Sequence, residues 1–307
     1  MIDFSENSEK RGFFSRNRIV SLAIIIACLL FVIIFFIEKS KVFVDMVPII
    51  RGEISLDGGF SITLIKNRYP ILIKKDDPIV GSRLRFSGDI KSIFSETSLL
   101  LAPNHGVIAE VGSHFGYNAI NIAKKMGDLS RYYTFEPNSK VFSCFLKSIV
   151  LNDLDKIVCP KNVAISDSVS SIAINDCLST AKNVYETHAK QRAIIVNSST
   201  LDEELKNEQM PVSFLMIDIP GSEFLILRGA KKIIEKSPDI KIVLSFSRKN
   251  SLKNTDVRLE LQKIKELGFV FYVVEGLGNL VLANIDDILS KDEVVVVMTR
   301  NKLILDY

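Results

Sequence analysis

The chain has 307 residues, of which 47% are apolar and 24% are charged, and its formal net charge is +3. This length allows one or two domains with a substantial core. The ordinary charged fraction excludes an intrinsically disordered chain and gives no sign of a nucleic-acid-binding tail. Fifteen Gly and nine Pro exclude a collagen-like or low-complexity chain.

An uncharged run, IVSLAIIIACLLFVIIFFI, occupies residues 19–37 and contains no Gly or Pro. A helix rises about 1.5 Å per residue, so a run of this length crosses a bilayer core of about 30 Å. The run is longer than the apolar part of a signal peptide, and it leads into Glu38 and Lys39 with no small-residue cleavage site. We predict a retained transmembrane anchor at 19–37, preceded by an exposed tail at 1–18 and followed by a tether at 38–51.

The four cysteines are not clustered, and no CxxC motif occurs. Cys28 lies in the apolar run, and the others are Cys144, Cys159 and Cys177. This pattern suits neither a disulfide framework nor a zinc site. We expect reduced, buried thiols and no metal site.

Residues 52–105 form a lead-in of short strands and one helical stretch at about 88–101, and strands then alternate with helices over 106–307. The predicted strands of this second part are 107–111, 132–135, one within 157–165, 214–219, 240–246, 269–274 and 294–298. The predicted helices are 117–126, 141–151, 224–234 and 255–267. This alternation predicts an α/β fold with a Rossmann-like, doubly wound, mostly parallel sheet of about seven strands. Such sheets bind ligands beyond the carboxyl ends of their strands.

The run EVGSHFG at residues 110–116 follows the first strand of this series and opens its first helix. Its glycines allow a tight turn and a close approach to a ligand. The GxxxG spacing departs from the GxGxxG of dinucleotide sites. A carboxylate at Glu110 suits a cationic or hydroxyl-bearing ligand better than a pyrophosphate. A turn that uses Gly only for packing is an equal alternative at this point.

Glu136 ends the next strand and precedes Pro137 and Asn138. A carboxylate at this strand tip can accept both hydroxyls of a ribose, and the alternative is a solvated or capping acid of the turn. Because the two strands are predicted neighbours, Glu110 and Glu136 should line one crevice.

Four runs together resemble the FkbM-type S-adenosylmethionine-dependent methyltransferases. They are GVIAEVGSHFGYNAINIAKK, YYTFEPNSKVFSCF, STLDEEL and FLMIDIPGSEFLILRGA, in that order. The resemblance extends over about residues 76–275 and includes the lead-in ILIKKDDPIVGSRLRFSGDI. It implies an S-adenosylmethionine cofactor and methyl transfer to a hydroxyl of a sugar or another small acceptor.

The resemblance also implies roles for residues that follow the strands. Those that would hold the cofactor are Glu110, Gly112 and Gly116 at its amino-acid end, Glu136 at the ribose with Asn138 beside it, and Ser166 and Asp167 at the adenine. Asp218 would face the methyl-transfer centre. The family commonly has D-x-E-G-x-E where this chain has DIPGSE, so Pro220 replaces an acid and removes a backbone donor.

His114 and His105 are candidate bases because imidazole suits the deprotonation of a hydroxyl. The alternative for each is an ordinary hydrogen-bonded loop residue. Arg228 would either bind an acid or pair with Glu223 on the same helix.

We therefore expect a membrane-anchored O-methyltransferase with a small-molecule or glycan acceptor and no nucleic-acid partner. One alternative is a degenerate module on the same fold that binds a nucleotide or glycan without chemistry, as Pro220 suggests. A nicotinamide-dependent oxidoreductase is disfavoured by the missing GxGxxG. The flanking charges barely bias the orientation of the anchor. Because S-adenosylmethionine is made in the cytosol, we lean towards a single-pass protein with a cytosolic catalytic domain.

Overall fold

The computed structural model describes residues 53–66, 68–175, 193–250, 256–276 and 278–303. They belong to one compact unit, which begins at Glu53. The predicted tail, anchor and tether at 1–51 lie outside the described residues. Within the described ranges, no helix is long and apolar enough to cross a membrane.

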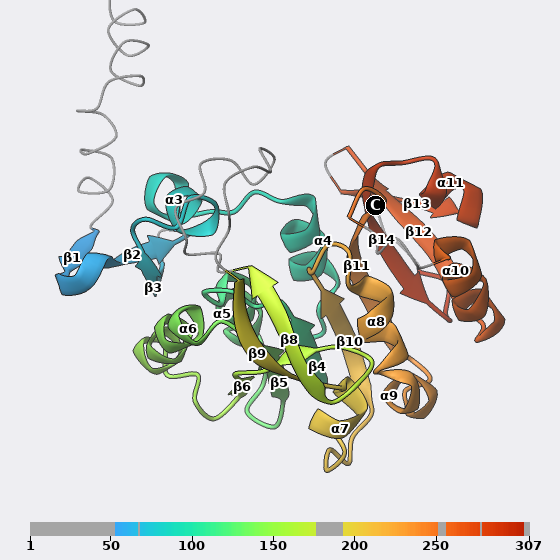
Figure 1. The fold of residues 1–307 in the computed structure, drawn as a ribbon, viewed down its shortest axis with the longest axis horizontal. Helices are drawn as coiled ribbons and strands as arrows, with labels where there is room; N and C mark the ends of the chain where they lie inside the picture. The colour runs from blue at the N-terminus through green and yellow to red at the C-terminus, as the bar shows by residue number, and fades with distance from the viewer. Residues whose placement is uncertain (1–52, 67, 176–192, 251–255, 277, 304–307) are drawn as a thin grey trace, which may run out of the picture. The chain divides into compact units, whose positions relative to one another are not determined.

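The lead-in begins with a small antiparallel sheet and continues into two helices (Figure 1). Its elements are β1 (Ile54–Leu56), β2 (Phe60–Ile65), β3 (Tyr69–Lys74), α3 (Val80–Ser87) and α4 (Ile93–Leu101). The prediction of one helix over 88–101 is wrong at its start. Gly88, at φ 65°, ends α3, and the Ser92 side chain begins α4 by accepting a hydrogen bond from the Ser95 N–H.

The main sheet has eight strands in the order β13-β12-β14-β11-β10-β4-β5-β6. They are β4 (Val107–Val111), β5 (Arg131–Phe135), β6 (Val158–Lys161), β10 (Val212–Ile217), β11 (Lys241–Ser247), β12 (Val270–Glu275), β13 (Asn279–Ala283) and β14 (Glu293–Thr299). The five strands from β11 to β6 are parallel, and the remaining three pair antiparallel. The Rossmann-like, mostly parallel sheet is confirmed. The count of seven is wrong because β13 was not predicted.

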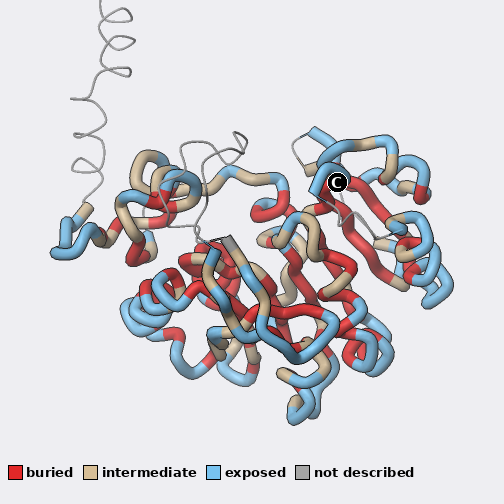
Figure 2. Tube along the Cα trace, viewed as in Figure 1, coloured by how far each residue is buried: buried red, intermediate tan, exposed pale blue. Residues whose placement is uncertain are grey.

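Alternate residues of a strand point to opposite faces of the sheet, so apolar strands give this sheet two apolar faces. Helices cover both of them. Phe214 and Met216 of β10 share a core cluster with α5 (Tyr117–Ala123) and α6 (Ser139–Leu151). Leu215 and Ile217 share a second cluster with α8 (Glu223–Arg228), α9 (Lys231–Lys236) and α10 (Val257–Glu266). Figure 2 shows the buried residues concentrated on the central strands.

A second three-stranded sheet, in the order β7-β9-β8, was not predicted. Its strands are β7 (Ala164–Ile165), β8 (Ser170–Asn175) and β9 (Ala193–Ser199), and α7 (Leu201–Glu204) follows it. The strand predicted within 157–165 is therefore two strands in two different sheets. The helix predicted at 224–234 is also divided, since Gly229 ends α8 and Ala230 precedes α9. Near the carboxyl end, α11 (Ile285–Leu289) connects β13 with β14.

Candidate functional site

Three acidic residues follow or end neighbouring parallel strands at the carboxyl edge of the main sheet. Glu110 is the penultimate residue of β4, Glu136 follows β5, and Asp218 follows β10. The register pairs Met216 with Glu110 and Val111 with Phe135, so the three acids come to one edge. The predicted placement of Glu110 and Glu136 on adjacent strands is confirmed by this register.

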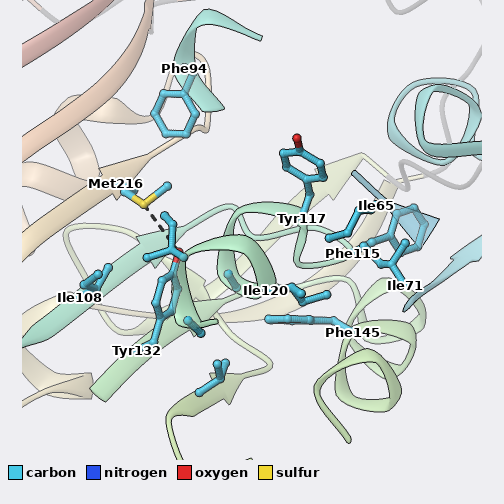
Figure 3. Close-up of a cluster of buried hydrophobic side chains, with 14 of the residues drawn as sticks. Ile65, Ile71, Phe94, Ile108, Phe115, Tyr117, Ile120, Tyr132, Phe145 and Met216 are labelled. Carbon is cyan, nitrogen blue, oxygen red and sulfur yellow. Dashed lines mark hydrogen bonds between the residues drawn. The ribbon is translucent and has the colours of Figure 1, made fainter. Parts of the chain in front are cut away.

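Glu110 is 1% exposed and accepts two side-chain hydrogen bonds. The Asn118 Nδ2 donates to its Oε1 at 3.1 Å, and the Tyr132 hydroxyl donates to its Oε2 at 3.0 Å. Figure 3 shows the same Tyr132 hydroxyl beside the sulfur of Met216. Burial raises the pKa of Glu110 to about 7, and the nearby charges of Asp218 and Glu136 act in the same direction.

The loop after β4 turns through three residues with positive φ, namely Gly112 at 96°, His114 at 50° and Gly116 at 89°. A Cβ on Gly116 would lie 2.1 Å from the ring of Phe145, and one on Gly112 would lie 2.9 Å from the Asp218 carbonyl oxygen. Both glycines are therefore required by backbone conformation and by close packing. Their predicted contact with a ligand stays a prediction.

Glu136 is 6% exposed, and the backbone turns around its carboxylate. Its Oε2 accepts from the His114 N–H at 3.1 Å, and its Oε1 accepts from the Asn138 N–H at 2.8 Å. Burial raises its pKa to about 7, against the effect of these two hydrogen bonds. The Asn138 side chain caps α6 by accepting from Lys140 and Val141. Glu136 thus joins the glycine loop to the start of α6.

Asp218 differs from the other two acids because its side chain is exposed to solvent. Desolvation of the carboxyl by the surrounding protein nevertheless raises its pKa to about 6, and a hydrogen bond with Ser245 opposes this shift. Asp218 is therefore the most exposed of the three acids at this edge.

The turn that follows Asp218 is stabilised by Glu223 rather than by Asp218. The Ser222 N–H donates to the Ile219 carbonyl at 3.0 Å, with Pro220 at the second position and Gly221, at φ 95°, at the third. This is the residue pattern of a type II turn, which favours Pro and Gly at those positions. The buried Glu223 carboxylate accepts from Gly221 and from Ser247. Pro220 is thus accommodated without strain.

The two histidines lie apart from Asp218. The His114 ring contacts Phe115 edge-on at 4.4 Å, and its Nε2 lies 3.5 Å from Oδ2 of Asp77. Burial lowers the pKa of His114, which the Asp77 charge opposes. His105 precedes β4, at the end of the strand opposite to Glu110, and packs against Gly127. His105 is therefore not positioned to act as a base at the edge where the three acids lie.

Ser166 and Asp167 follow β7 of the small sheet and lie beside the end of α8. The Ser166 N–H donates to Ser199, and a Cβ on Gly229 would lie 2.0 Å from the Ser166 carbonyl oxygen. The Asp167 carboxylate pairs with Arg228, which also pairs with Glu260. The alternative pairing of Arg228 with Glu223 is therefore wrong. The role of Ser166 and Asp167 at an adenine stays a prediction.

Two cavities lie away from the three acids. One of about 710 Å³ is formed between α7, α9 and the start of β10. Another, of about 460 Å³, is an apolar groove between the first strands and α6. Within the described ranges, no group of three or more His, Cys, Asp or Glu side chains is arranged to hold a metal ion. Cys144 and Cys159 are free thiols, whereas Cys28 and Cys177 lie outside the described residues.

Sequence reasoning missed four side chains that act on these residues, which are Asp77, Asn118, Tyr132 and Ser245. Of these, Asn118, Tyr132 and Ser245 lie in elements that the sequence placed correctly. A polar side chain within an otherwise apolar helix or strand needs a buried partner, and this pattern could have indicated a contact with a nearby acid.

We expect Glu110→Gln to make the free energy of unfolding of the ligand-free protein less dependent on pH. The folded-state pKa of about 7 exceeds the ordinary 4.5, so folding retains a proton that the unfolded chain releases. That contribution is complete below the ordinary pKa and is lost as pH rises through the folded one. In Gln, Oε1 can accept from Tyr132 and Nε2 can donate to the Asn118 Oδ1, which has no partner among the described residues.

Denaturant titrations at pH 5 and pH 8 measure this difference. Between these values the wild type should lose up to about 3 kcal/mol of unfolding free energy relative to the variant. Parallel pH dependence of the two proteins would show that Glu110 is ionised at both values.

A family model described as the methyltransferase FkbM domain matches residues 110–271. Among curated proteins, none matches the chain. Similar solved structures include TrmK of M. capricolum in complex with S-adenosylhomocysteine, at 14% identity and a TM-score of 0.41, covering 70% of each chain. A putative transferase of Pyrococcus horikoshii has 10% identity and a TM-score of 0.45, covering 78% of this chain and 71% of that one. An O-methyltransferase of Bacillus cereus has 14% identity and a TM-score of 0.38, covering 67% and 78%.

Proposed function

Because the chain belongs to the FkbM methyltransferase domain family, whose members use S-adenosylmethionine, we propose that it methylates a hydroxyl of a sugar or another small acceptor. The observation that carries this proposal is the position of Asp218. Asp218 is an exposed residue at the tip of β10, beside β4, whose buried acid Glu110 and following glycine loop lie at the same edge. An acceptor that reaches Asp218 would therefore meet the cofactor at that edge.

The residues at this edge fit the charges of the cofactor. S-adenosylmethionine carries a sulfonium and an ammonium, and the edge supplies the buried carboxyls of Glu110 and Glu136. The Asn118 Oδ1 is buried beside Glu110, and it has no hydrogen-bond partner within the described part of the chain. This acceptor is suited to an ammonium donor. Each oxygen of Glu136 accepts one backbone N–H and keeps a free lone pair for a ribose hydroxyl.

When bound, the cofactor supplies an electrophilic methyl group on a positively charged sulfur. The chain has to place the acceptor hydroxyl in line with that methyl and remove its proton. Asp218 is accessible, and its pKa of about 6 leaves it ionised at neutral pH while making it a stronger base than an ordinary carboxylate. Its hydrogen bond with Ser245 fixes its direction. His114 is turned towards Asp77 and is the weaker candidate for the base.

The alternative of a degenerate binding module draws on Pro220, and the local geometry favours the enzyme. Pro220 occupies a turn position that suits it, and Glu223 accepts the hydrogen bonds of that turn. Glu223, rather than Asp218, therefore accepts the backbone N–H of this turn. The substitution changes the charge of the turn but leaves the candidate base in place.

Incubation of the full chain with methyl-labelled S-adenosylmethionine and separate pools of sugars, glycans and RNA tests the proposal. Transfer to a sugar or glycan hydroxyl, identified by mass spectrometry, is the expected result. Cofactor binding by calorimetry without transfer to any pool would favour the binding module. Transfer to RNA would overturn the proposed acceptor class.

The proposed anchor at 19–37 would hold this enzyme at a membrane, with its catalytic domain on the cytosolic side where the cofactor is made. Its support is the length and apolarity of that run. A lipid-linked glycan is an acceptor that such an anchor would bring within reach.

We expect deletion of residues 1–38 to release a folded domain from membranes. The described residues begin a compact unit at Glu53, and they contain no helix able to span a bilayer. Sedimentation with membranes, compared between the full chain and the shortened one, measures the change. If the shortened chain still sediments with the membranes, their binding site lies in the domain itself.

A further inference from the structure

The lead-in segment 76–89 contacts the glycine loop although it lies outside residues 110–271, which the family model matches. Phe115 of the loop is fully buried in one cluster with Ile65 and Ile71 of β2 and β3, and Figure 3 shows the three side chains together. The loop is thus packed against the lead-in as well as against α6.

Asp77 is held in place by hydrogen bonds to the backbone of this segment. It is 1% exposed, and its Oδ1 accepts from the Ile79 N–H at 3.2 Å and from the Gly81 N–H at 2.7 Å. A Cβ on Gly81 would lie 2.8 Å from the Asp77 Cβ, so the turn is closely packed. The second oxygen, Oδ2, points to His114 and lies 3.5 Å from its Nε2.

His114 connects Asp77 to Glu136, the residue proposed to bind the ribose. Its backbone is left-handed, with φ 50°, which costs a non-glycine residue energy unless its surroundings hold it. Its ring lies between Asp77 and Phe115, while its N–H donates to Glu136 Oε2 at 3.1 Å. The ring contact therefore holds the backbone that orients the Glu136 carboxylate.

A second contact lies on the other side of Gly116. The Tyr117 hydroxyl at the start of α5 donates a hydrogen bond to Asp89, the residue after α3 and its Gly88 cap. The lead-in thus contacts the loop both before and after the glycine. Only the Asp77 contact continues to Glu136.

We propose that Asp77 is a positioning residue for the cofactor, acting through His114 on the carboxylate that accepts the ribose hydroxyls. This inference rests on the proposed function, because it requires a ribose at Glu136. It adds to the site a part of the chain that precedes the residues matched by the family model.

The test replaces Asp77 by Ser in the full chain. A Ser hydroxyl keeps an oxygen near the Gly81 N–H but has none that reaches His114. We expect affinity for S-adenosylhomocysteine, measured by calorimetry, to fall about fivefold. Asp77→Asn keeps both atoms, and neutral imidazole can accept from its amide, so affinity should return to within about twofold of wild type. The matched control is Asp76→Ser, which changes an exposed neighbour paired with Lys74.

A 2′,3′-dideoxy analogue of S-adenosylhomocysteine separates positioning from a general structural role. Without the ribose hydroxyls, Asp77→Ser and Asp76→Ser should bind the analogue equally. Equal losses for both ligands, or no loss for either, would overturn the inference while leaving the proposed function intact. A wild-type chain that binds no S-adenosylhomocysteine would overturn both. Thermal melting of each variant verifies that the domain is folded.

Discussion

Replacing Asp218 by Asn should reduce methyl transfer by about 10²-fold or more, with little change in cofactor affinity. Asn has the same shape but cannot take a proton from an acceptor hydroxyl. Proton transfer by a positioned group contributes about 10² to 10⁴ in rate, or roughly 3 to 5 kcal/mol of barrier. Cofactor affinity should persist because the residues proposed to hold the cofactor lie in or after β4 and β5, whereas Asp218 follows β10. Turnover on the identified acceptor and the cofactor dissociation constant measure the two effects separately.

The pH profile gives this prediction a second measurement. Turnover of the wild type should rise with pH through about 6, as Asp218 ionises, and Asp218→Asn should lack that rise. Asp239→Asn is the matched control, since Asp239 is an exposed acid before β11 whose carboxylate bonds Asn301. Near-full turnover of the Asp218 variant would assign this residue a structural role.

The parts of the fold that the sequence predicted well are the buried parallel strands. VIAEV and FLMI are apolar runs bounded by Gly or Pro, and such runs indicate strands covered on both faces. The strand ends then indicate the edge at which Glu110, Glu136 and Asp218 meet. Strand order was enough to infer this meeting, because neighbouring parallel strands end together.

The strands that escaped prediction lack this apolar pattern. In β13 only Leu280 is buried, so the strand is an exposed edge whose pairing with β12 decides its conformation. The β7-β9-β8 sheet is similar, since Ala193 to Asn197 of β9 alternate between exposed and half-buried residues. Tertiary pairing rather than local pattern determines such elements.

The contacts of the candidate site depend on separations along the chain that periodicity does not encode. Asp77 contacts His114 from a turn in the lead-in, and Tyr132 contacts Glu110 from the neighbouring strand. The sequence identified His114 as a residue of interest from its chemistry. In the structure its ring lies beside Asp77 and its N–H donates to Glu136, and its role as a base stays a prediction.

Glu136→Ala should weaken S-adenosylmethionine binding at least tenfold without unfolding the chain. Hydrogen bonds to a charged acceptor contribute about 1.5 to 3 kcal/mol each, and about 1.4 kcal/mol corresponds to a tenfold change. The variant loses the acceptor for the ribose and also the acceptor that orients the His114 and Asn138 N–H groups. Calorimetry with the cofactor measures the loss.

Glu208→Ala is the matched control for this variant. Glu208 accepts a hydrogen bond from Tyr133 of β5 at 2.7 Å, but it lies at the cavity between α7 and α9 rather than at the cofactor edge. Its removal should therefore cost some stability and leave the dissociation constant unchanged. If the two variants bind the cofactor equally well, Glu136 is not part of the site. If only the Glu136 variant binds weakly, the ribose is held at the tip of β5. The carboxylate that holds it is the one that accepts the N–H groups of His114 in the glycine loop and of Asn138 before α6.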